Sequence, residues 1–329
     1  MKLSDLGEFG FINKIREKSH DISGVMLGIG DDAAATSITP GMALLSTSDL
    51  LTEGVHFRLD WSDPVTLGRK SLSVNLSDIA AMGGIPRYAL LSIAVPAGFS
   101  MEFLSSFIDG FLQQAEKYSV SLIGGDTSAS ASGFFISVTL LGEQYPDRIV
   151  RRSGACNGDL VCVSGTLGDS ALGLDLLKSG SYSKEQVIKH LDPTPRVELG
   201  TLLAELKIPT SMIDISDGLH ADLGHILKAS AKGAKICIDN TPLSDIFRNS
   251  VSKNSPDYYR FPLSGGEEYE LLFTLHPSRL KDAEEAAAKA GTSVSVIGEI
   301  TEESGLFLAS ADGSSYSAEL NCYDHFALN

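Results

Sequence analysis

The stretch Leu122-Ile-Gly-Gly-Asp-Thr-Ser128 decides how the first half of this chain is interpreted. An apolar run leads directly into two glycines, an aspartate and two hydroxyl residues. Glycine lets the backbone turn sharply or approach a ligand closely, and the Asp126 carboxylate with its neighbouring hydroxyls can hold a hard cation. The alternative is a turn in which the aspartate only makes local hydrogen bonds. Taken alone, the stretch fits both interpretations.

The same chemistry returns at 30–32, 47–49, 214–218 and 264–268, where Gly or Ser stands beside an acid after an apolar run. If several of these acids converge, each carboxylate raises the pKa of its neighbours unless cations neutralise them. Oxygen ligands without Cys or His favour magnesium or calcium over zinc. The prominent acids are Asp31, Asp32, Asp49, Asp78, Asp126, Asp214, Asp217, Glu267 and Glu268.

Composition excludes several classes of protein. The 329 residues carry a formal net charge of −16 with no basic stripe, so we expect no nucleic-acid partner. The N-terminus lacks the apolar segment of a signal peptide. The longest apolar run, 88–99, is short and interrupted by Pro96, so it cannot span a bilayer. We therefore expect a cytoplasmic protein with no membrane association.

Residue periodicity predicts helices and strands in alternation. In the first half we expect helices over 8–18, 63–82 and 101–118, the second starting at Asp63-Pro64 and the third capped by Ser100. Strands are expected over 42–46, 88–95, 121–123 and 134–141. In the second half, strands are expected over 160–164, 211–215, 235–238, 269–274 and 294–297, with helices over 171–178, 219–231 and 278–290 and another ending at Leu206.

The polar segment Gln144-Tyr-Pro-Asp-Arg148 is the predicted domain boundary, because it contains proline and lies at mid-chain. We expect a first domain over 1–148 and a second over 149–329. Alternation of strand and helix predicts an α/β (α+β) fold with a mixed sheet and helices in each domain.

Several known phosphate-binding motifs are excluded. Residues 28–33 fit G-x-G-x-x-A, but Pro40-Gly41 follows where a dinucleotide-binding helix should run. The chain has no P-loop and no protein-kinase signature. We expect phosphates to be held instead by backbone amides at Gly124-Gly125 or at the helix start Ser216-Asp217-Gly218, with Arg152 as the basic partner.

These motifs together resemble the thiamine-monophosphate kinase family, in order and over nearly the whole chain. They are Gly28-Ile-Gly-Asp-Asp32, Ser46-Thr-Ser-Asp49, Gly54-Val-His-Phe57, Val74-Asn-Leu-Ser-Asp-Ile-Ala-Ala-Met-Gly83, Ile123-Gly-Gly-Asp-Thr127, Arg152-Ser-Gly154, Gly165-Thr-Leu-Gly-Asp-Ser170, Ile213-Asp-Ile-Ser-Asp-Gly218, Leu263-Ser-Gly-Gly-Glu-Glu-Tyr-Glu-Leu271 and Tyr323-Asp-His-Phe326. Each is weak alone, whereas the ordered set is specific. The family belongs to the superfamily of aminoimidazole ribonucleotide synthetase and selenophosphate synthetase.

The resemblance implies the last step of thiamine diphosphate biosynthesis, in which ATP and thiamine monophosphate give ADP and thiamine diphosphate with several Mg²⁺ ions. It also implies two α/β domains and a homodimer formed through the first of them. By motif, the metal ligands would be Asp32, Thr47, Ser48, Asp49, Asp78, Asp126, Asp214 and Asp217. ATP would contact Gly125, Asp126, Arg152 and Ser216, and the thiamine substrate would contact His56, Glu267 and Tyr323.

No Cys or His within the acidic motifs stands out as a nucleophile, which predicts direct in-line transfer without a phosphoenzyme. The acceptor phosphate is already anionic near neutral pH, since its second pKa is about 6. Two alternatives remain at this stage: an ATP-dependent ligase of the same superfamily, and a non-catalytic protein that binds nucleotide or metal. Individual residues also have simpler interpretations, such as Glu267 and Glu268 as solvated charges beside a strand.

Overall fold

The structure is a computed structural model that describes residues 7–316. The chain divides into two compact units. Unit 1 comprises residues 1–79 and 84–147, and unit 2 comprises residues 80–83 and 148–329. Each unit combines a mixed β-sheet with helices, as the sequence predicts. No helix within the described part of the chain is long and apolar enough to cross a membrane.

Unit 1 contains a four-stranded sheet in the order β3-β6-β4-β5. Strands β4 and β5 are parallel, and the other neighbours are antiparallel. A two-stranded sheet, β1-β2, and helix α2 lie near the N-terminus. The bounds are α2 (Glu8–Lys18), β1 (Val25–Leu27), β2 (Ala35–Thr36), β3 (Ala43–Thr52), α3 (Pro64–Ala81), β4 (Ile85–Pro96), α4 (Met101–Lys117), β5 (Ser121–Ser130) and β6 (Phe135–Gln144).

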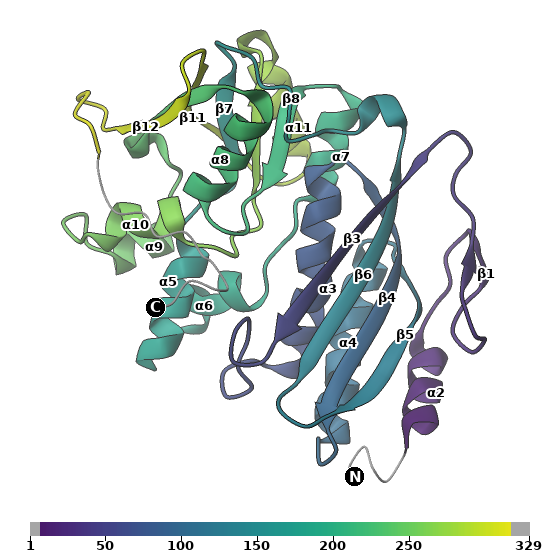
Figure 1. The fold of residues 1–329 in the computed structure, drawn as a ribbon. Helices are drawn as coiled ribbons and strands as arrows, with labels where there is room; N and C mark the ends of the chain where they lie inside the picture. Colours follow the sequence, from purple (N-terminus) through teal and green to yellow (C-terminus); the bar gives the residue numbers. More distant parts are fainter. Residues whose placement is uncertain (1–6, 317–329) are drawn as a thin grey trace. The chain divides into compact units, whose positions relative to one another are not determined.

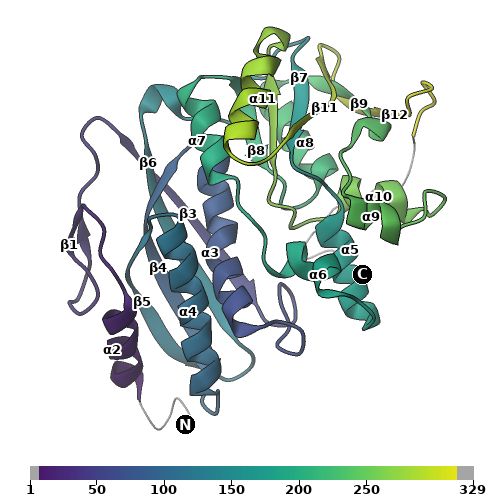
Figure 2. The same cartoon turned by 180° about the vertical axis from the view of Figure 1, so that it is seen from behind.

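Helices α3 and α4 cover one face of the four-stranded sheet (Figures 1 and 2). Each begins where the sequence predicts a cap. The Asp63 carboxylate accepts hydrogen bonds from the amides of Val65 (2.9 Å) and Thr66 (3.2 Å), and the Ser100 hydroxyl accepts one from Phe103. The helices bury their apolar stripes against the sheet, where the fully buried Phe134 ring is surrounded by other aromatic rings.

Strands β3 and β5 are longer than the sequence analysis predicts. Strand β3 pairs with β6 over all ten residues, so Thr47, Ser48 and Asp49 lie inside the strand rather than after it. Strand β5 likewise continues through Gly124-Gly125 instead of turning there. A Cβ atom on Gly125 would lie 1.8 Å from the Leu91 carbonyl oxygen, and the φ angle of Gly125 is 151°. The glycine therefore permits close approach of β4, not a turn.

Unit 2 is built on a six-stranded sheet in the order β12-β9-β11-β7-β10-β8, in which β12 and β9 are parallel and the other neighbours antiparallel. Helix α8 packs on β8 and β10. The strands are β7 (Leu160–Ser164), β8 (Pro209–Asp214), β9 (Gly233–Cys237), β10 (Leu271–Leu275), β11 (Val294–Thr301) and β12 (Gly305–Ala309). The helices are α5 (Asp169–Ser179), α6 (Lys184–Leu191), α7 (Val197–Glu205), α8 (Leu219–Ser230), α9 (Asp245–Ser250), α10 (Asp257–Ser264) and α11 (Leu280–Lys289).

Candidate active site

Three of the predicted metal ligands meet on the helix-covered side of the unit 1 sheet. The Thr47 hydroxyl on β3 donates a hydrogen bond to the Asp78 carboxylate in the last turn of α3. Burial, together with the nearby charge of Asp78, raises the pKa of Asp49 to about 6. The C-terminal turn of a helix disfavours a carboxylate. The negative charge of Asp78 is therefore disfavoured both by the helix dipole and by the neighbouring carboxylate of Asp49. A bound cation would relieve both repulsions.

Ser48 and Asp126 lie on the opposite face of the same sheet. Side chains alternate along a strand, so Ser48 points away from Thr47 and Asp49, and its hydroxyl is 3.1 Å from that of Thr139. Asp126 is exposed and pairs in register with Ser92, which belongs to the same open face as Ser48. Because the predicted strand ends at Ser46, the sequence does not indicate that these predicted ligands lie on two different faces of the sheet.

The remaining predicted residues of unit 1 lie in loops. Asp32 is exposed, and its amide donates to the Asp31 carboxylate at 3.0 Å. His56 is half-buried, and its Nδ1 accepts a hydrogen bond from the Thr52 amide at 3.0 Å. A neutral imidazole that accepts at Nδ1 carries its proton on Nε2. His56 is therefore set to donate a hydrogen bond from Nε2.

In unit 2, Asp214 ends β8 and is buried, and the turn Ser216-Asp217-Gly218 leads into α8. The three amides of this turn each donate to the Asp222 carboxylate at 3.1 Å. In this structure the Asp222 side chain, one turn into the helix, therefore accepts from the amides that the sequence analysis assigns to phosphate, and the phosphate role of this turn stays a prediction. Burial and the charge of Asp217 raise the pKa of Asp222 to about 7, although the three amides favour its ionised form. Asp217, Asp222 and His225 also have ligand atoms within 4.8 Å of one another.

Glu267 is anchored beside this turn. Its amide donates to the Ser216 carbonyl at 2.8 Å, and the Tyr269 amide donates to the Ile215 carbonyl at 2.9 Å. The Glu267 Oε2 atom is 3.3 Å from Nδ1 of His190, a residue that the sequence analysis did not select. Glu267 and Ser216 are therefore neighbours in unit 2, and Asp214 and Asp217 lie within two residues of Ser216 along the chain.

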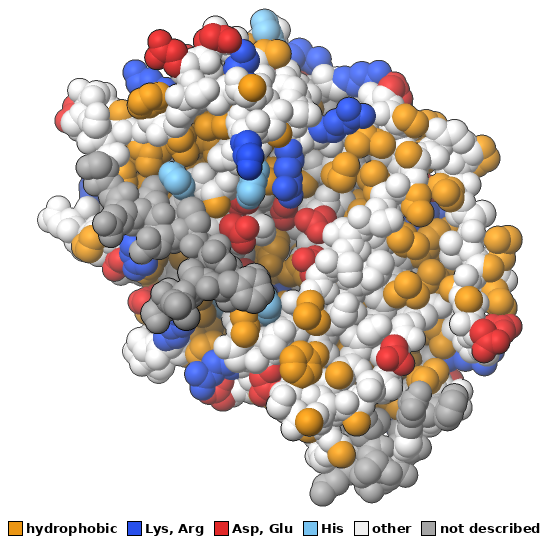
Figure 3. Space-filling view, in the orientation of Figure 1, with side chains coloured by type: hydrophobic (Ala, Val, Ile, Leu, Met, Phe, Trp, Pro, Cys, Tyr) orange, Lys and Arg blue, Asp and Glu red, His pale blue; other side chains and the backbone are white. Residues whose placement is uncertain are grey.

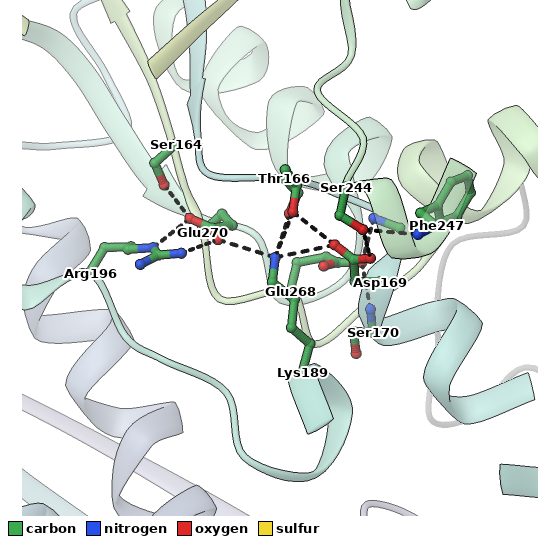
Figure 4. A network of polar contacts seen from close by, with 11 residues as sticks. Ser164, Thr166, Asp169, Ser170, Lys189, Arg196, Ser244, Phe247, Glu268 and Glu270 are labelled. Carbon is green, nitrogen blue, oxygen red and sulfur yellow. Dashed lines mark hydrogen bonds and ion pairs between the residues drawn. The ribbon is translucent and has the colours of Figure 1, made fainter. Parts of the chain in front are cut away.

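A second network of ionisable side chains includes Glu268 and Glu270 (Figure 4). The Arg196 guanidinium donates two hydrogen bonds to the buried Glu270 carboxylate, at 2.7 and 2.5 Å. Lys189 Nζ lies 3.5 Å from Glu270 and 3.4 Å from Asp169. Glu268 accepts amide hydrogen bonds from Gly168 and Ser170 at the start of α5. Glu268 is only 4% exposed, so its interpretation as a solvated charge is wrong.

Two further predicted contacts, Arg152 and Tyr323, belong to the second half of the chain. Arg152 is exposed, and its carbonyl accepts a hydrogen bond of 3.5 Å from the Ser230 hydroxyl. Tyr323 lies outside the described residues. Both assignments stay predictions.

Family models match both halves of the chain: the AIR synthase related protein N-terminal domain at residues 30–144 and the corresponding C-terminal domain at residues 157–310. The chain is similar to the thiamine-monophosphate kinase of Bacillus subtilis, with 33% identity over 98% of this chain and 100% of the relative. The enzyme of Escherichia coli K12 is 37% identical over 98% of each chain.

Solved structures agree with this relationship. The crystal structure of thiamine-monophosphate kinase from Stenotrophomonas maltophilia has a TM-score of 0.85 at 34% identity, covering 94% of this chain and 98% of that one. The structure described as AaThiL complexed with AMPPCP and TMP has a TM-score of 0.78 at 34% identity over 99% of each chain. Escherichia coli HypE, a hydrogenase maturation protein, reaches 0.78 at 19% identity over 97% of this chain and 99% of that one, which shows a shared fold alone.

Proposed function

We infer the activity of this chain from the family to which it belongs, the thiamine-monophosphate kinases among the AIR synthase related proteins. The chain is a kinase that transfers a phosphoryl group from ATP to thiamine monophosphate. The observation that carries this conclusion is the match, over 99% of both chains, to a relative that was crystallised with AMPPCP, an ATP analogue, and TMP. That match also disfavours the ligase and the non-catalytic alternatives.

Magnesium is the metal we propose for this reaction, and the residues present fit it. Thr47, Asp49 and Asp78 offer only oxygen atoms, and the two carboxylates are close enough to raise the pKa of Asp49. Mg²⁺ prefers such ligands and usually also binds substrate phosphates. When bound, it would neutralise the charge on the phosphates during transfer. Further predicted ligands are Asp32, Ser48, Asp126, Asp214 and Asp217.

The chain's own residues would bind and orient the two substrates. Gly125, Asp126, Arg152 and Ser216 are the proposed ATP contacts, and His56, Glu267 and Tyr323 are the proposed contacts of the thiamine moiety. Support comes from His56, whose ring is oriented by the hydrogen bond that its Nδ1 accepts from the Thr52 amide. Transfer is direct, because no Cys or His within the acidic motifs stands out as a nucleophile. The acceptor phosphate also needs no general base. A trapped phosphoenzyme carrying labelled phosphate would contradict this scheme.

We also propose that unit 1 pairs with its copy in a homodimer. Helices α3 and α4 cover one face of its sheet, and the outer face carries Leu44 and Leu50, which are 48% and 56% exposed. Figure 3 shows hydrophobic side chains gathered on this face. Exposed apolar patches of this kind often mark interfaces. Analytical ultracentrifugation should find a dimer that Leu50→Glu weakens. The cytoplasmic location stays a prediction from the sequence.

The activity is tested by phosphorus NMR on a mixture of protein, ATP, Mg²⁺ and thiamine monophosphate. Formation of ADP and thiamine diphosphate, abolished by a chelator, is the expected result. ATP consumption with aminoimidazole ribonucleotide precursors but not with thiamine monophosphate would favour a ligase instead. Nucleotide binding by calorimetry without turnover would favour the non-catalytic alternative.

A further inference from the structure

We propose that His190 is a positioning residue that holds the Glu267 carboxylate in place for the thiamine substrate. The proposal rests on the proposed function, in which Glu267 contacts that substrate. His190 is in α6, is 4% exposed, and has its Nδ1 3.3 Å from Glu267 Oε2. The same Nδ1 atom is 3.1 Å from the hydroxyl oxygen of Ser170 on α5.

The two contacts at one nitrogen favour a hydrogen on Nδ1. If Ser170 donated to Nδ1, the nitrogen lone pair and the Glu267 carboxylate would face each other without a hydrogen between them. If Nδ1 carries the hydrogen, it can donate to both oxygens, and the Ser170 hydroxyl hydrogen is free to turn elsewhere. The geometry therefore assigns an Nδ1–H group that donates to Glu267.

This arrangement is not that of a Ser-His-acid nucleophile. In such triads the hydroxyl and the carboxylate bind opposite nitrogens of the imidazole, so that the base can take the hydroxyl proton. Here both oxygens lie at Nδ1. Ser170 is also fully buried at the start of α5. Ser170 and His190 therefore act together as a support for Glu267 and not as reacting groups.

The backbone of Glu267 shows the same fixation. Its φ is 59°, in the left-handed region that residues other than glycine seldom adopt. Such a conformation costs free energy and persists where the surroundings determine it. Hydrogen bonds from the amides of Glu267 and Tyr269 to the 215–216 turn supply that constraint. The backbone is thus held by β8 and its following turn, and the side chain by His190.

Thiamine monophosphate offers two groups that suit a fixed carboxylate: the cationic thiazolium ring and the amino group of the pyrimidine. ATP has an amino group on its adenine but no cationic ring, so loss of the support should weaken binding of the thiazolium of thiamine monophosphate and leave ATP binding intact. A purely structural role of His190 would affect both substrates and the melting temperature together.

The test compares two isosteric substitutions. The side-chain nitrogen of Asn takes the place of Nδ1, whereas that of Gln takes the place of Nε2. We expect His190→Gln to raise KM for thiamine monophosphate about 10- to 100-fold, as loss of a hydrogen bond to a charged group would. KM for ATP should stay within about twofold of the unchanged enzyme, since a twofold change is well under 1 kcal/mol. His190→Asn should restore most of the lost affinity, and Glu267→Gln should match His190→Gln.

His276→Gln is the matched control, because this exposed histidine also contacts a serine but has no carboxylate at its ring within residues 7–316. Equal KM values for His190→Gln and the unchanged enzyme would overturn the proposal, as would equal losses with Asn and Gln. If Glu267→Gln leaves both KM values unchanged while turnover continues, the positioning role fails and the kinase activity stands. Nitrogen NMR of labelled histidine adds a readout that needs no turnover: a His190 Nδ1 without hydrogen contradicts the proposal.

Discussion

The Glu268 carboxylate accepts a 2.7 Å hydrogen bond from the Gly168 amide, at the start of α5. The same Oε1 atom accepts a second bond, of 3.2 Å, from the Ser170 amide. Its other oxygen, Oε2, has no hydrogen-bond partner among residues 7–316. Burial dominates over the nearby Lys189 charge and raises the pKa of Glu268 to about 8. The side chain is therefore largely a neutral acid at neutral pH.

This pKa predicts a pH dependence of stability. The folded pKa lies above the ordinary Glu value of 4.5, so between the two values the folded state binds more protons than the unfolded state. The free energy of unfolding should therefore fall as pH rises from about 4.5 to about 8. Glu268→Gln keeps a neutral acceptor for both amides and should flatten this decline. Denaturant titrations at several pH values measure it, with the exposed Glu285→Gln as control. An unchanged slope in Glu268→Gln would contradict the assignment.

The Arg196–Glu270 pair should be important for folding of unit 2. Glu270 is 1% exposed and also accepts a 2.6 Å hydrogen bond from Ser164. Arg196→Met leaves this buried carboxylate without its bidentate partner, which should destabilise the protein by about 3–5 kcal/mol. Arg196→Lys keeps the charge but not the planar fork, so its loss should be smaller.

A solvent-exposed pair provides the matched control for Arg196. Arg260 donates two hydrogen bonds to one oxygen of Asp257, at 2.8 and 2.6 Å, but both side chains are well exposed. Arg260→Met should therefore change the free energy of unfolding by less than about 1 kcal/mol. Denaturant unfolding of the two Met variants checks the contrast, and similar losses would show that burial of the pair is not decisive.

Gly124 and Gly125 offer a neighbouring pair for a test of the unit 1 sheet. A Cβ on Gly125 would lie 1.8 Å from a backbone oxygen of β4, whereas one on Gly124 would meet only the tip of Leu90, at 3.1 Å. Gly125→Ala should therefore disrupt the β4–β5 pairing, and Gly124→Ala should be tolerated. Melting temperatures of the two variants measure this difference: Gly125→Ala should melt at a lower temperature than Gly124→Ala. Equal melting temperatures would mean that the sheet adjusts at this position.

Much of the fold could be predicted from local patterns. The helical stripe and the caps at Asp63 and Ser100 place α3 and α4 within one residue of their observed ends. Strands β3 and β5 were cut short because their later residues are hydroxyls, glycines and acids. Such residues are typical of loops, yet long-range pairing with β6 and β4 holds them in the sheet. Helix α6 and strand β12 were missed, because short segments carry little periodicity.

The candidate site divides in the same way. Gly or Ser beside an acid after an apolar run selects Asp49, Asp214 and Glu267 as candidates, and an acid beside Ser77 near a helix C-terminus selects Asp78. His190 gave no such signal, since a lone histidine in an amphipathic helix looks like any core residue. Its contact with Glu267 joins residues 77 positions apart (267 minus 190) and depends on how α6 packs on α5. Only tertiary structure supplies that information.

The Thr47–Asp49–Asp78 cluster leads to a prediction on Mg²⁺. Asp78→Asn keeps an acceptor for the Thr47 hydroxyl but removes one of two carboxylates that repel each other. The variant should therefore fold as well as the unchanged protein without metal, yet bind Mg²⁺ at least about tenfold more weakly and lose turnover. A ligand that binds only the folded state raises the melting temperature, so the Mg²⁺-dependent rise should shrink in Asp78→Asn. Asp109→Asn, which removes the exposed carboxylate partner of Lys18 in the same unit, should keep the Mg²⁺-dependent rise in melting temperature. If Asp78→Asn shows the full rise, the cluster does not hold the metal.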